Sequence, residues 1–537
     1  MDLLLRLLFE GLVALVRSIQ KSRAERELKE RGVELPEGMV DHTTSAAEVI
    51  ASLMQQESLT RTQLAAAVIA LEDAQARASR IAGDLAALRG AAILSAVIRD
   101  QLLPALDALR GPIRELRDRA GTSAGPKPRL QLADIYRAAA LVQELDERIM
   151  QVSVLEALGA SRVNPDVAHS LTDAESIAET LLTPIQQFAA AQDVRLPAQR
   201  PIAAPAQEGG ESIWFGLLPP DYPILFVPAD FHKDLHRYAS VPHELGHLLW
   251  RAVPGLADEV LERSGIVPME GLFYQSKGRF HGHLDQLYSA WLPEIWADFV
   301  AVLLAGPAAA FGLLHSFADP DQPLRTACAV AYGDSYAEHP PALLRIHLAA
   351  HLLVQLGFDA EAKTLVGEWE AIHKEQPFLL VDAQAEDQLR LGFAPVLRRG
   401  QQLVEQLYEI QWRTLSGFRL ADIPGMEMGP GLWAKVQARA EMLAADQPFN
   451  DSGRVVLCAA IVARRRHPAR SLVIALGLRR AILGRDTDER RVADPAFQHR
   501  RGVGVEPGFN EEIRAALIMR EVLFRPPRGR LGRQPRG

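Results

Sequence analysis

The sequence is poor in cysteine, and its few thiols lie far apart. Cys328 and Cys458 are the two cysteines in a chain of 537 residues. This spacing excludes a disulfide framework and a thiolate zinc cluster, and it favours a reducing compartment, so we expect a cytoplasmic protein. An excess of basic residues is also missing, since the formal net charge is −8. This charge gives no reason to expect nucleic acid as a partner.

Long uninterrupted apolar runs are missing as well. Residues 1–20 are apolar, but Arg6 and Glu10 interrupt them, and neither a basic leader nor a small-residue cleavage site is present. This run therefore predicts neither a signal peptide nor a spanning helix. On a helix its charged residues form one stripe, and we expect the apolar face to pack against the protein, with contact to a membrane surface as the alternative. Residues 299–314 are too short to span a bilayer and contain a Gly-Pro pair, so no transmembrane segment is predicted.

Helix-forming residues dominate the chain, which predicts a mainly α protein. Eight apolar residues recur with alternating spacings of three and four, as in a helical hairpin or a short coiled coil. They are Leu64, Ala67, Leu71, Ala74, Ala78, Ile81, Leu85 and Leu88. These N-terminal helices also offer a surface for a partner protein.

Changes in composition predict five regions along the chain. They are a helical or coiled-coil region at 1–120, a helical region at 121–200, a core region at 201–350, a C-terminal helical region at 351–520 and a basic disordered tail at 521–537. A Pro/Gly/Ala-rich connector at 195–212 precedes the core region. Two short strands are predicted after it, at 212–218 and 222–228, and they are the only convincing strands. The expected fold class is mainly α with a small β-sheet.

The stretch VPHELGHLLW (241–250) places His243 and His247 four residues apart, with Glu244 directly after the first histidine. On a helix, residues i and i+4 lie on the same face, so both imidazoles can reach one ion. Glu244 then lies about 100° round the helix, beside an open coordination position. Zinc hydrolases use this arrangement with the glutamate as general base. The alternative is a helix that carries two histidines without a metal.

A catalytic metal needs a third protein ligand, and no histidine follows His247 at the short spacing used by some zinc peptidases. The stretch WLPEIWADFVA (291–301) instead places Glu294 and Asp298 four residues apart on a predicted helix. Such a pair can supply both the third metal bond and the acceptor that orients a ligating histidine. The alternative, two acids that face solvent, fits poorly because both lie beside a strongly apolar run.

These two stretches together resemble the gluzincin metallopeptidases, the thermolysin-like class, with H-E-x-x-H followed by E-x-x-x-D. The resemblance implies a gluzincin-like catalytic domain flanked by helical regions. It also implies one Zn²⁺ ion per chain, held by three residues: His243, His247 and Glu294. In the same pattern Glu244 is the general base and Asp298 hydrogen-bonds to His243. The strand at 222–228 corresponds to the sheet edge that holds an extended peptide substrate.

A third stretch, YAEHPPALLRI (336–346), resembles the His-Pro-Pro…Arg segment of the gluzincin group that includes the CAAX-processing and heat-shock membrane proteases. It implies that His339 stabilises the carbonyl oxygen of the substrate and that Arg345 is a structural or carboxylate-binding partner. The alternative donors are three tyrosines: Tyr288, Tyr332 and Tyr336. Because that group spans membranes several times and this sequence predicts no such helices, prenylated substrates are not carried over. The resemblance covers roughly residues 211–350.

The expected function is therefore that of a zinc metallopeptidase acting on a protein or peptide substrate. Two alternatives stay open: a helical scaffold or effector with an intact metal site that does not cleave proteins, and a zinc amidase that acts on a small molecule. Four further histidines are expected in loops or on the surface without a metal. They are His232, His236, His281 and His283.

Overall fold

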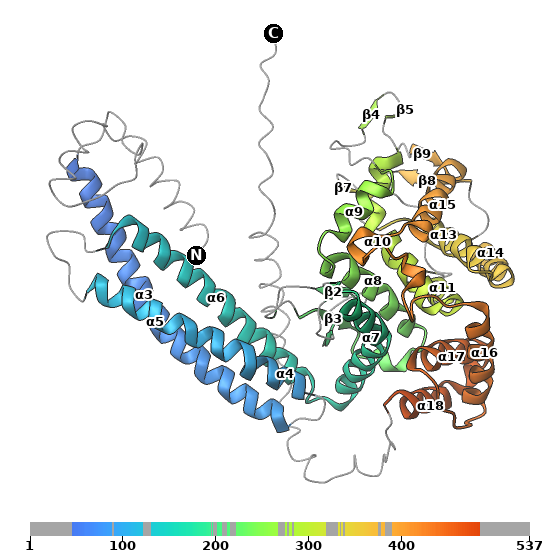
Figure 1. Ribbon diagram of the computed structural model, residues 1–537, viewed down its shortest axis with the longest axis horizontal. Helices are drawn as coiled ribbons and strands as arrows, with labels where there is room; N and C mark the ends of the chain where they lie inside the picture. The colour runs from blue at the N-terminus through green and yellow to red at the C-terminus, as the bar shows by residue number, and fades with distance from the viewer. Residues whose placement is uncertain are drawn as a thin grey trace. The chain divides into compact units, whose positions relative to one another are not determined.

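The computed structural model divides into two compact units, which are described separately (Figure 1). The described part of the first unit ends at Ala160, and the second unit begins at Ser161. The structure describes residues 46–87, 91–121, 130–194, 196, 201–206, 212–214, 218, 222–266, 274–276, 279–281, 284–317, 331–332, 335–336, 339–373, 377–381 and 389–483. The apolar run at 1–20 and the basic tail at 521–537 lie outside these residues, so the expectations for them stay predictions.

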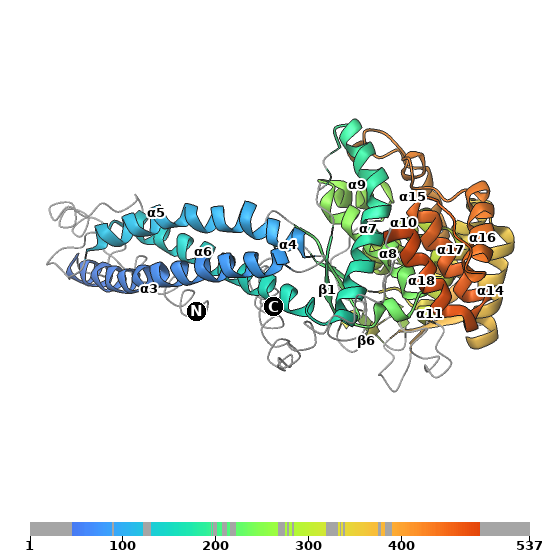
Figure 2. The same ribbon diagram turned by 90° about the horizontal axis from the view of Figure 1, so that it is seen from below.

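The first unit is built from three long helices, α3, α5 and α6, that lie side by side, together with the short helix α4 (Figures 1 and 2). They are α3 (Ala46–Ala87), α4 (Ala92–Val97), α5 (Leu103–Ala120) and α6 (Leu132–Ser161), with a π-helical turn at Ile98–Leu102. Seven of the eight predicted seam residues are at most 6% exposed, and Leu88 lies outside the described residues. The predicted buried seam of α3 is thus confirmed, because α5 packs along this helix. Helix α6 also contacts α3, through an ion pair between Arg77 and Glu156 at 2.6 Å.

The second unit is a larger helical body with one continuous apolar core. Its helices are α7 (Pro165–Ala191), α8 (Ser240–Ala252), α9 (Leu256–Arg263), α10 (Leu284–Ala305), α11 (Pro307–Phe317), α13 (Ala342–Gln355), α14 (Asp359–His373), α15 (Phe393–Glu409), α16 (Pro430–Ala444), α17 (Gly453–Arg466) and α18 (Ser471–Leu483). The pair formed by α8 and α10 lies within this core, and it carries the residues that the sequence singles out (Figure 1).

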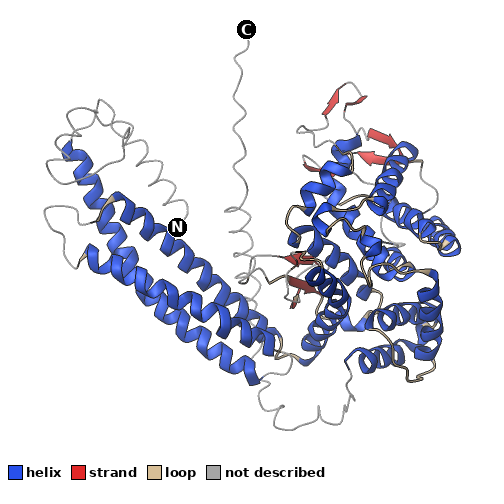
Figure 3. Ribbon diagram, in the orientation of Figure 1, coloured by secondary structure: helices blue, strands red, loops and turns tan. Residues whose placement is uncertain are grey.

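Strands form small separate sheets among the helices (Figure 3). The largest sheet has the order β1-β3-β2 and consists of β1 (Ile202–Pro205), β2 (Ser212–Trp214) and β3 (Ile224–Val227). Strand β3 pairs in parallel with β1 and antiparallel with β2. The remaining strands form two-stranded pairs: β4 (Tyr274–Ser276) with β5 (Arg279–His281), β6 (Ala331–Tyr332) with β7 (Ser335–Tyr336), and β8 (Phe378–Val381) with β9 (Leu389–Gly392). The predicted fold class, mainly α with a small β-sheet, is confirmed.

Three expectations about the strands are wrong. The two predicted strands are not the only ones, since β1 and the three pairs from β4 to β9 are also present. Strand β1 lies inside the stretch predicted as a connector, because its sequence of Ile202, two alanines and a proline has only one of the branched or aromatic residues that mark strands. The strand at 222–228 is also not a sheet edge. It contains β3, which has a partner on both sides and therefore cannot add a peptide strand.

The predicted region boundaries differ from the division of the structure. The region at 121–200 is divided, because α6 belongs to the first unit whereas Ile177, Leu181 and Ile185 of α7 are buried in the core of the second. No break occurs at residue 350, since α13 runs through it and packs against α10. A proline-rich composition marks a turn, and only burial decides whether the flanking helices share a core.

Helix α10 is the apolar centre of this core. Its segment Leu287–Ala305 is long and apolar enough to cross a membrane by length and composition, and 78% of that window is buried inside the protein. The core helix of a folded domain meets the same two criteria. Trp291 and Trp296 are fully buried on it, and they help to fix α10 against its neighbours.

Candidate metal centre

The two motif histidines lie on α8 with their rings turned toward each other. The Nε2 atoms of His243 and His247 are 3.2 Å apart, and the ring planes meet at 87°. Val241, Leu245 and Leu248 of the same helix are buried, which fixes its orientation in the core. The regular helix thus brings both imidazoles to one point, as the spacing predicts.

Helix α10 approaches α8 closely at Gly246, which lies between His243 and His247 on α8. A Cβ atom at this position would lie only 2.6 Å from Cα of Ala297, so only glycine allows this contact. Trp296 Nε1 donates a hydrogen bond to the carbonyl of Gly246 at 3.1 Å and holds the two helices in register. This contact places Glu294 and Asp298, one on either side of Ala297 along α10, against the motif histidines.

Glu294 completes a group of three ligand atoms. Its Oε2 lies 3.4 Å from His243 Nε2, and its Oε1 lies 3.2 Å from His247 Nε2. The ligand atoms of all three residues lie within 4.8 Å of one another, a geometry that could hold a metal ion. Glu294 Oε2 is buried and forms no well-aligned hydrogen bond with the described residues, its nearest donors being His243 Nε2 at 3.4 Å and Arg345 Nη1 at 3.6 Å. A bound cation would satisfy this oxygen, and two imidazoles with one carboxylate are a donor set that suits zinc and similar divalent metals.

Asp298 lies behind His243, on the side away from Glu294. Its Oδ1 is 2.9 Å from His243 Nδ1, so it accepts the Nδ1 proton and leaves Nε2 free to bind a metal. Arg345, from α13, donates from Nε and from Nη2 to the two oxygens of Asp298, each at 2.7 Å. Its Nη1 lies 3.6 Å from Glu294 Oε2. Of the two roles expected for Arg345, the structural one agrees with this buried position.

The pKa values of His243 and Glu294 reflect the close contact between imidazoles and carboxylates in this group. Burial by itself would lower the pKa of His243, but its contacts with the carboxylates of Asp298 and Glu294 raise that pKa to about 10. Burial would likewise raise the pKa of Glu294, yet the bonds from His243 and His247 hold it well below its usual range. Both directions have one cause, since the attraction between the carboxylates and the basic groups beside them outweighs desolvation of each.

Glu244 is buried on α8 and is not one of the three converging ligands. Burial raises the pKa of its carboxyl group, and the nearby His243 and His247 oppose the shift. A carboxylate with a raised pKa accepts a proton more readily than an exposed one. The position and the pKa of Glu244 therefore suit a general base.

The other candidates fall into three different environments. His339 precedes α13, its side chain is 65% exposed, and its Nε2 lies 3.5 Å from Glu294 Oε1. Tyr332 and Tyr336 lie in β6 and β7, which pair with each other. Tyr288 does not qualify as a donor to substrate: it is fully buried, and its hydroxyl group donates to the carbonyl of Val396 at 2.6 Å. Its aromatic ring belongs to the helical core, which the sequence alone could not reveal.

Two contributions to this group were not predicted from the sequence. Gly246 lies inside the H-E-x-x-H motif, but the sequence does not show that α10 packs against it. Phe317 of α11 places its ring 4.8 Å from the guanidinium carbon of Arg345. No spacing in the sequence connects Phe317 with the motif, because α11 reaches the group through tertiary packing.

The expected metal-free histidines are distributed as follows. His232 and His236 are half-buried in the segment before α8, so they are not simple surface residues. His281 lies in β5, and His283 lies outside the described residues. His232 and His236, whose side chains the structure describes, do not join the group of His243, His247 and Glu294.

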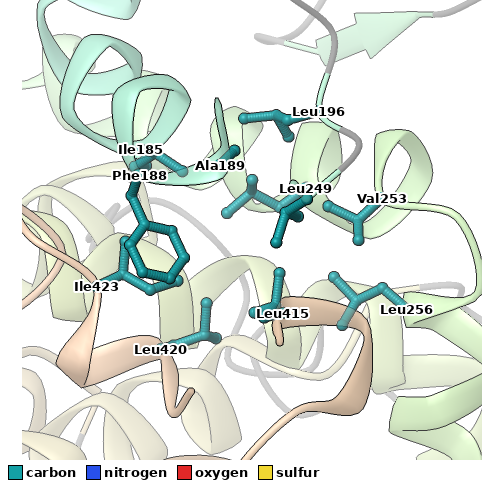
Figure 4. Close-up of a pocket in the computed structure, with 11 residues that line it drawn as sticks. Ile185, Phe188, Ala189, Leu196, Leu249, Val253, Leu256, Leu415, Leu420 and Ile423 are labelled. Carbon is teal, nitrogen blue, oxygen red and sulfur yellow. The ribbon is translucent and has the colours of Figure 1, made fainter. Parts of the chain in front are cut away.

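An apolar pocket lies on the opposite side of α8 (Figure 4). Leu249, which lies about 200° round the helix from His247, forms part of its wall. The lining carries no polar side chain: Ile185, Phe188, Ala189, Val194, Leu196, Leu249, Val253, Leu256, Leu415, Leu420 and Ile423. The pocket offers nothing to the chemistry of the metal centre, because it shares none of its residues.

Comparison of the chain with protein-family models, with curated proteins and with solved structures finds no match. The arguments about function that follow therefore depend on the geometry of the group itself and on the resemblance of its motifs.

Proposed function

We propose that the second unit is a zinc-dependent metallopeptidase. The observation that supports this function best is the convergence of His243, His247 and Glu294 within 4.8 Å, with Glu244 buried beside them. A structural zinc site usually has four protein ligands, whereas a catalytic site has three and keeps one position open. Among the described residues three ligands converge, which favours the catalytic arrangement.

Each side chain then has a defined task. A zinc ion held by His243, His247 and Glu294 would supply Lewis-acid chemistry, namely polarisation of a carbonyl and a lower pKa for a water molecule. Glu244 takes the proton of the attacking water and passes it to the leaving amine. His339 donates a hydrogen bond to the carbonyl oxygen as negative charge develops there. Asp298 holds the Nδ1 proton of His243.

The substrate proposed is a protein or peptide. A peptide strand would have to pair with an outer strand of the sheet, and β2 is the outer strand that packs against α8. A zinc amidase acting on a small molecule would use the same residues and differ only in substrate. In the scaffold alternative the metal site catalyses no hydrolysis, so the buried Glu244 has no catalytic role.

The substitution Glu244→Gln separates the peptidase from the scaffold. We expect the variant to bind zinc as the wild type does and to lose peptide hydrolysis by about 10² to 10⁴-fold, because the general base is gone while the ligands remain. Hydrolysis of casein and of a peptide library measures the activity, and metal analysis measures the zinc. Glu370→Gln, an exposed acid on α14, is the control. Unchanged turnover in Glu244→Gln would show that the mechanism is wrong.

The substitution His339→Ala tests the donor to the carbonyl oxygen. We expect kcat to fall by about 10² to 10³-fold with little change in KM, since the hydrogen bond strengthens only in the transition state. His351→Ala is a matched control, because this histidine pairs with Glu405 at 3.0 Å outside the metal group. A rise in KM alone would assign His339 to substrate binding and leave Tyr332 and Tyr336 as donors.

A further inference from the structure

Arg345 carries a permanent positive charge and touches Glu294 and Asp298, the two acids of α10 at the candidate metal centre. Its side chain is buried, it donates to both oxygens of Asp298 at 2.7 Å, and its Nη1 lies 3.6 Å from Glu294 Oε2. A planar guanidinium that faces both oxygens of a carboxylate fixes the rotation of that carboxylate. Because Asp298 Oδ1 also accepts the proton of His243 Nδ1, the rotation of Asp298 controls the direction of the imidazole.

We infer that Arg345 is a positioning residue of the metal centre, acting on His243 through Asp298, and not a residue that binds substrate. This inference rests on the metal binding in the proposed function and is independent of peptide hydrolysis. The guanidinium is buried, its Nε and Nη2 donate to Asp298, and its Nη1 lies beside Glu294, so a substrate carboxylate would have to displace these contacts to reach it. Phe317 covers it with an aromatic ring at 4.8 Å, a cation–π contact that keeps it in place.

The charge of Arg345 also matches the site to a divalent ion. Glu244, Glu294 and Asp298 contribute three negative charges when ionised, and Arg345 contributes one positive charge. With both imidazoles neutral the group carries two negative charges, which a divalent cation neutralises. Buried charges that are fully balanced avoid the large cost of an unpaired ion in the protein interior.

Positioning and charge predict opposite results when Arg345 is removed. A positive charge near the metal repels it, so by Coulomb attraction alone Arg345→Met would bind a divalent cation more tightly. If Arg345 orients the group, the same variant binds the cation more weakly, because Asp298 can turn and the imidazole of His243 is no longer held. The sign of the change in affinity therefore decides between the two effects.

The experiment measures the affinity of purified full-length variants for Co²⁺ and Zn²⁺ by competition with a chelator. We expect Arg345→Met to lose about 10 to 100-fold in affinity, as is typical when a residue that orients a ligand is lost. Arg345→Lys keeps the charge without the planar pair of donors, and we expect it to lose affinity too. The absorption spectrum of bound Co²⁺ reports ligand geometry and should change in both variants.

Arg399→Met is the matched control. Arg399 lies on α15 and pairs with Asp285 of α10 at 2.9 Å, so its loss also breaks a pair of arginine and aspartate on the same helix. We expect wild-type metal affinity from this control. Tighter binding by Arg345→Met, or a wild-type affinity and spectrum in Arg345→Lys, would overturn the inference.

The double variant Asp298→Asn/Arg345→Met guards against misfolding, because it removes both charges of the buried pair. If Arg345 acts through Asp298, the double variant binds Co²⁺ about as weakly as Asp298→Asn alone. Additive losses would overturn the inference, since Arg345 would then act independently of Asp298. If Arg345→Met binds metal more weakly but the wild type hydrolyses no peptide, the proposed peptidase function is wrong and the positioning role of Arg345 is supported. A wild-type protein that binds neither ion would overturn both.

Discussion

His232 and His236 are spaced four residues apart in the sequence, as are His243 and His247. The two pairs lie in the same unit, and the second follows the first after a short segment. The rings of His243 and His247 meet with their Nε2 atoms 3.2 Å apart. In the other pair, His232 Nδ1 lies 2.7 Å from Ser170 Oγ, whereas His236 stacks on the ring of His315 with centroids 4.1 Å apart. The same spacing thus gives a converging group that could hold a metal ion in one case and separate contacts in the other.

The backbone explains this difference. His243 and His247 belong to one regular helix, in which residues four apart share a face. The other pair is interrupted, because two short 3₁₀ turns, Phe231–Lys233 and Arg237–Ala239, replace the helix. Asp234 Oδ1 accepts a hydrogen bond from the backbone N–H of His236 at 3.0 Å, and such local bonds compete with helix formation. Spacing is therefore informative only where the helix is continuous.

The largest expected effect is on metal content. We expect His243→Ala, His247→Ala and Glu294→Ala each to lose most of the bound zinc, because each removes one of three ligands. His232→Ala and His236→Ala should retain about one zinc ion per chain. Metal analysis of the purified proteins provides the measurement. Full zinc in Glu294→Ala would remove that residue from the ligand set, and loss of zinc in His236→Ala would show that both pairs bind metal.

A smaller effect is expected at Gly246, which allows the helix of His243 and His247 to meet α10. We expect Gly246→Ala to lower the free energy of unfolding by about 1–3 kcal/mol, because the new methyl group meets the backbone of Ala297. Metal affinity should fall with it, since Glu294 and Asp298 are carried by the displaced helix. Thermal melting and chelator competition measure the two effects.

Gly367→Ala provides the control within the same unit. Gly367 lies inside α14, and a Cβ atom there would meet nothing within 4 Å. Alanine favours a helix over glycine by up to about 1 kcal/mol, so this variant should be equal to the wild type or slightly more stable. A Gly246→Ala protein as stable as Gly367→Ala would mean that the contact between α8 and α10 is not as close as described.

The smallest expected effect is the response of His236 to pH. Burial, and then the nearby His315, lower its pKa from 6.5 to about 4, although Asp234 opposes the shift. Arg464 and Arg465 lower it further. Since the unfolded chain takes up a proton near pH 6.5 and the folded chain resists this until about pH 4, stability is lost as pH falls between these values.

We therefore expect His236→Gln to show a flatter dependence of stability on pH between about 6.5 and 4 than the wild type. Urea unfolding at a series of pH values measures this slope. Asp234 has a pKa lowered to about 2, chiefly by its hydrogen bond to His315, so its own contribution is lost at lower pH. An identical slope in the variant and the wild type would place His236 in contact with water.

The candidate site could be predicted in part from short-range patterns. The relative positions of His243, Glu244 and His247 follow from a single turn of one helix. Those of Glu294 and Asp298 follow from a single turn of another. Helical periodicity is a local property, so the sequence also indicated the buried seam of α3 and the mainly α class. Which residues share one face of a helix could therefore be predicted without the structure.

Tertiary packing alone decided which elements meet. The sequence determined the two motif helices, but the depth of their contact at Gly246 and Ala297, the pairing of Arg345 with Asp298 and the ring of Phe317 depend on residues far apart in the chain. It also could not show that β3 is a central strand or that Tyr288 faces the core. Both facts depend on neighbours from other segments, and a side chain acquires such neighbours only when its helix or strand is buried against them.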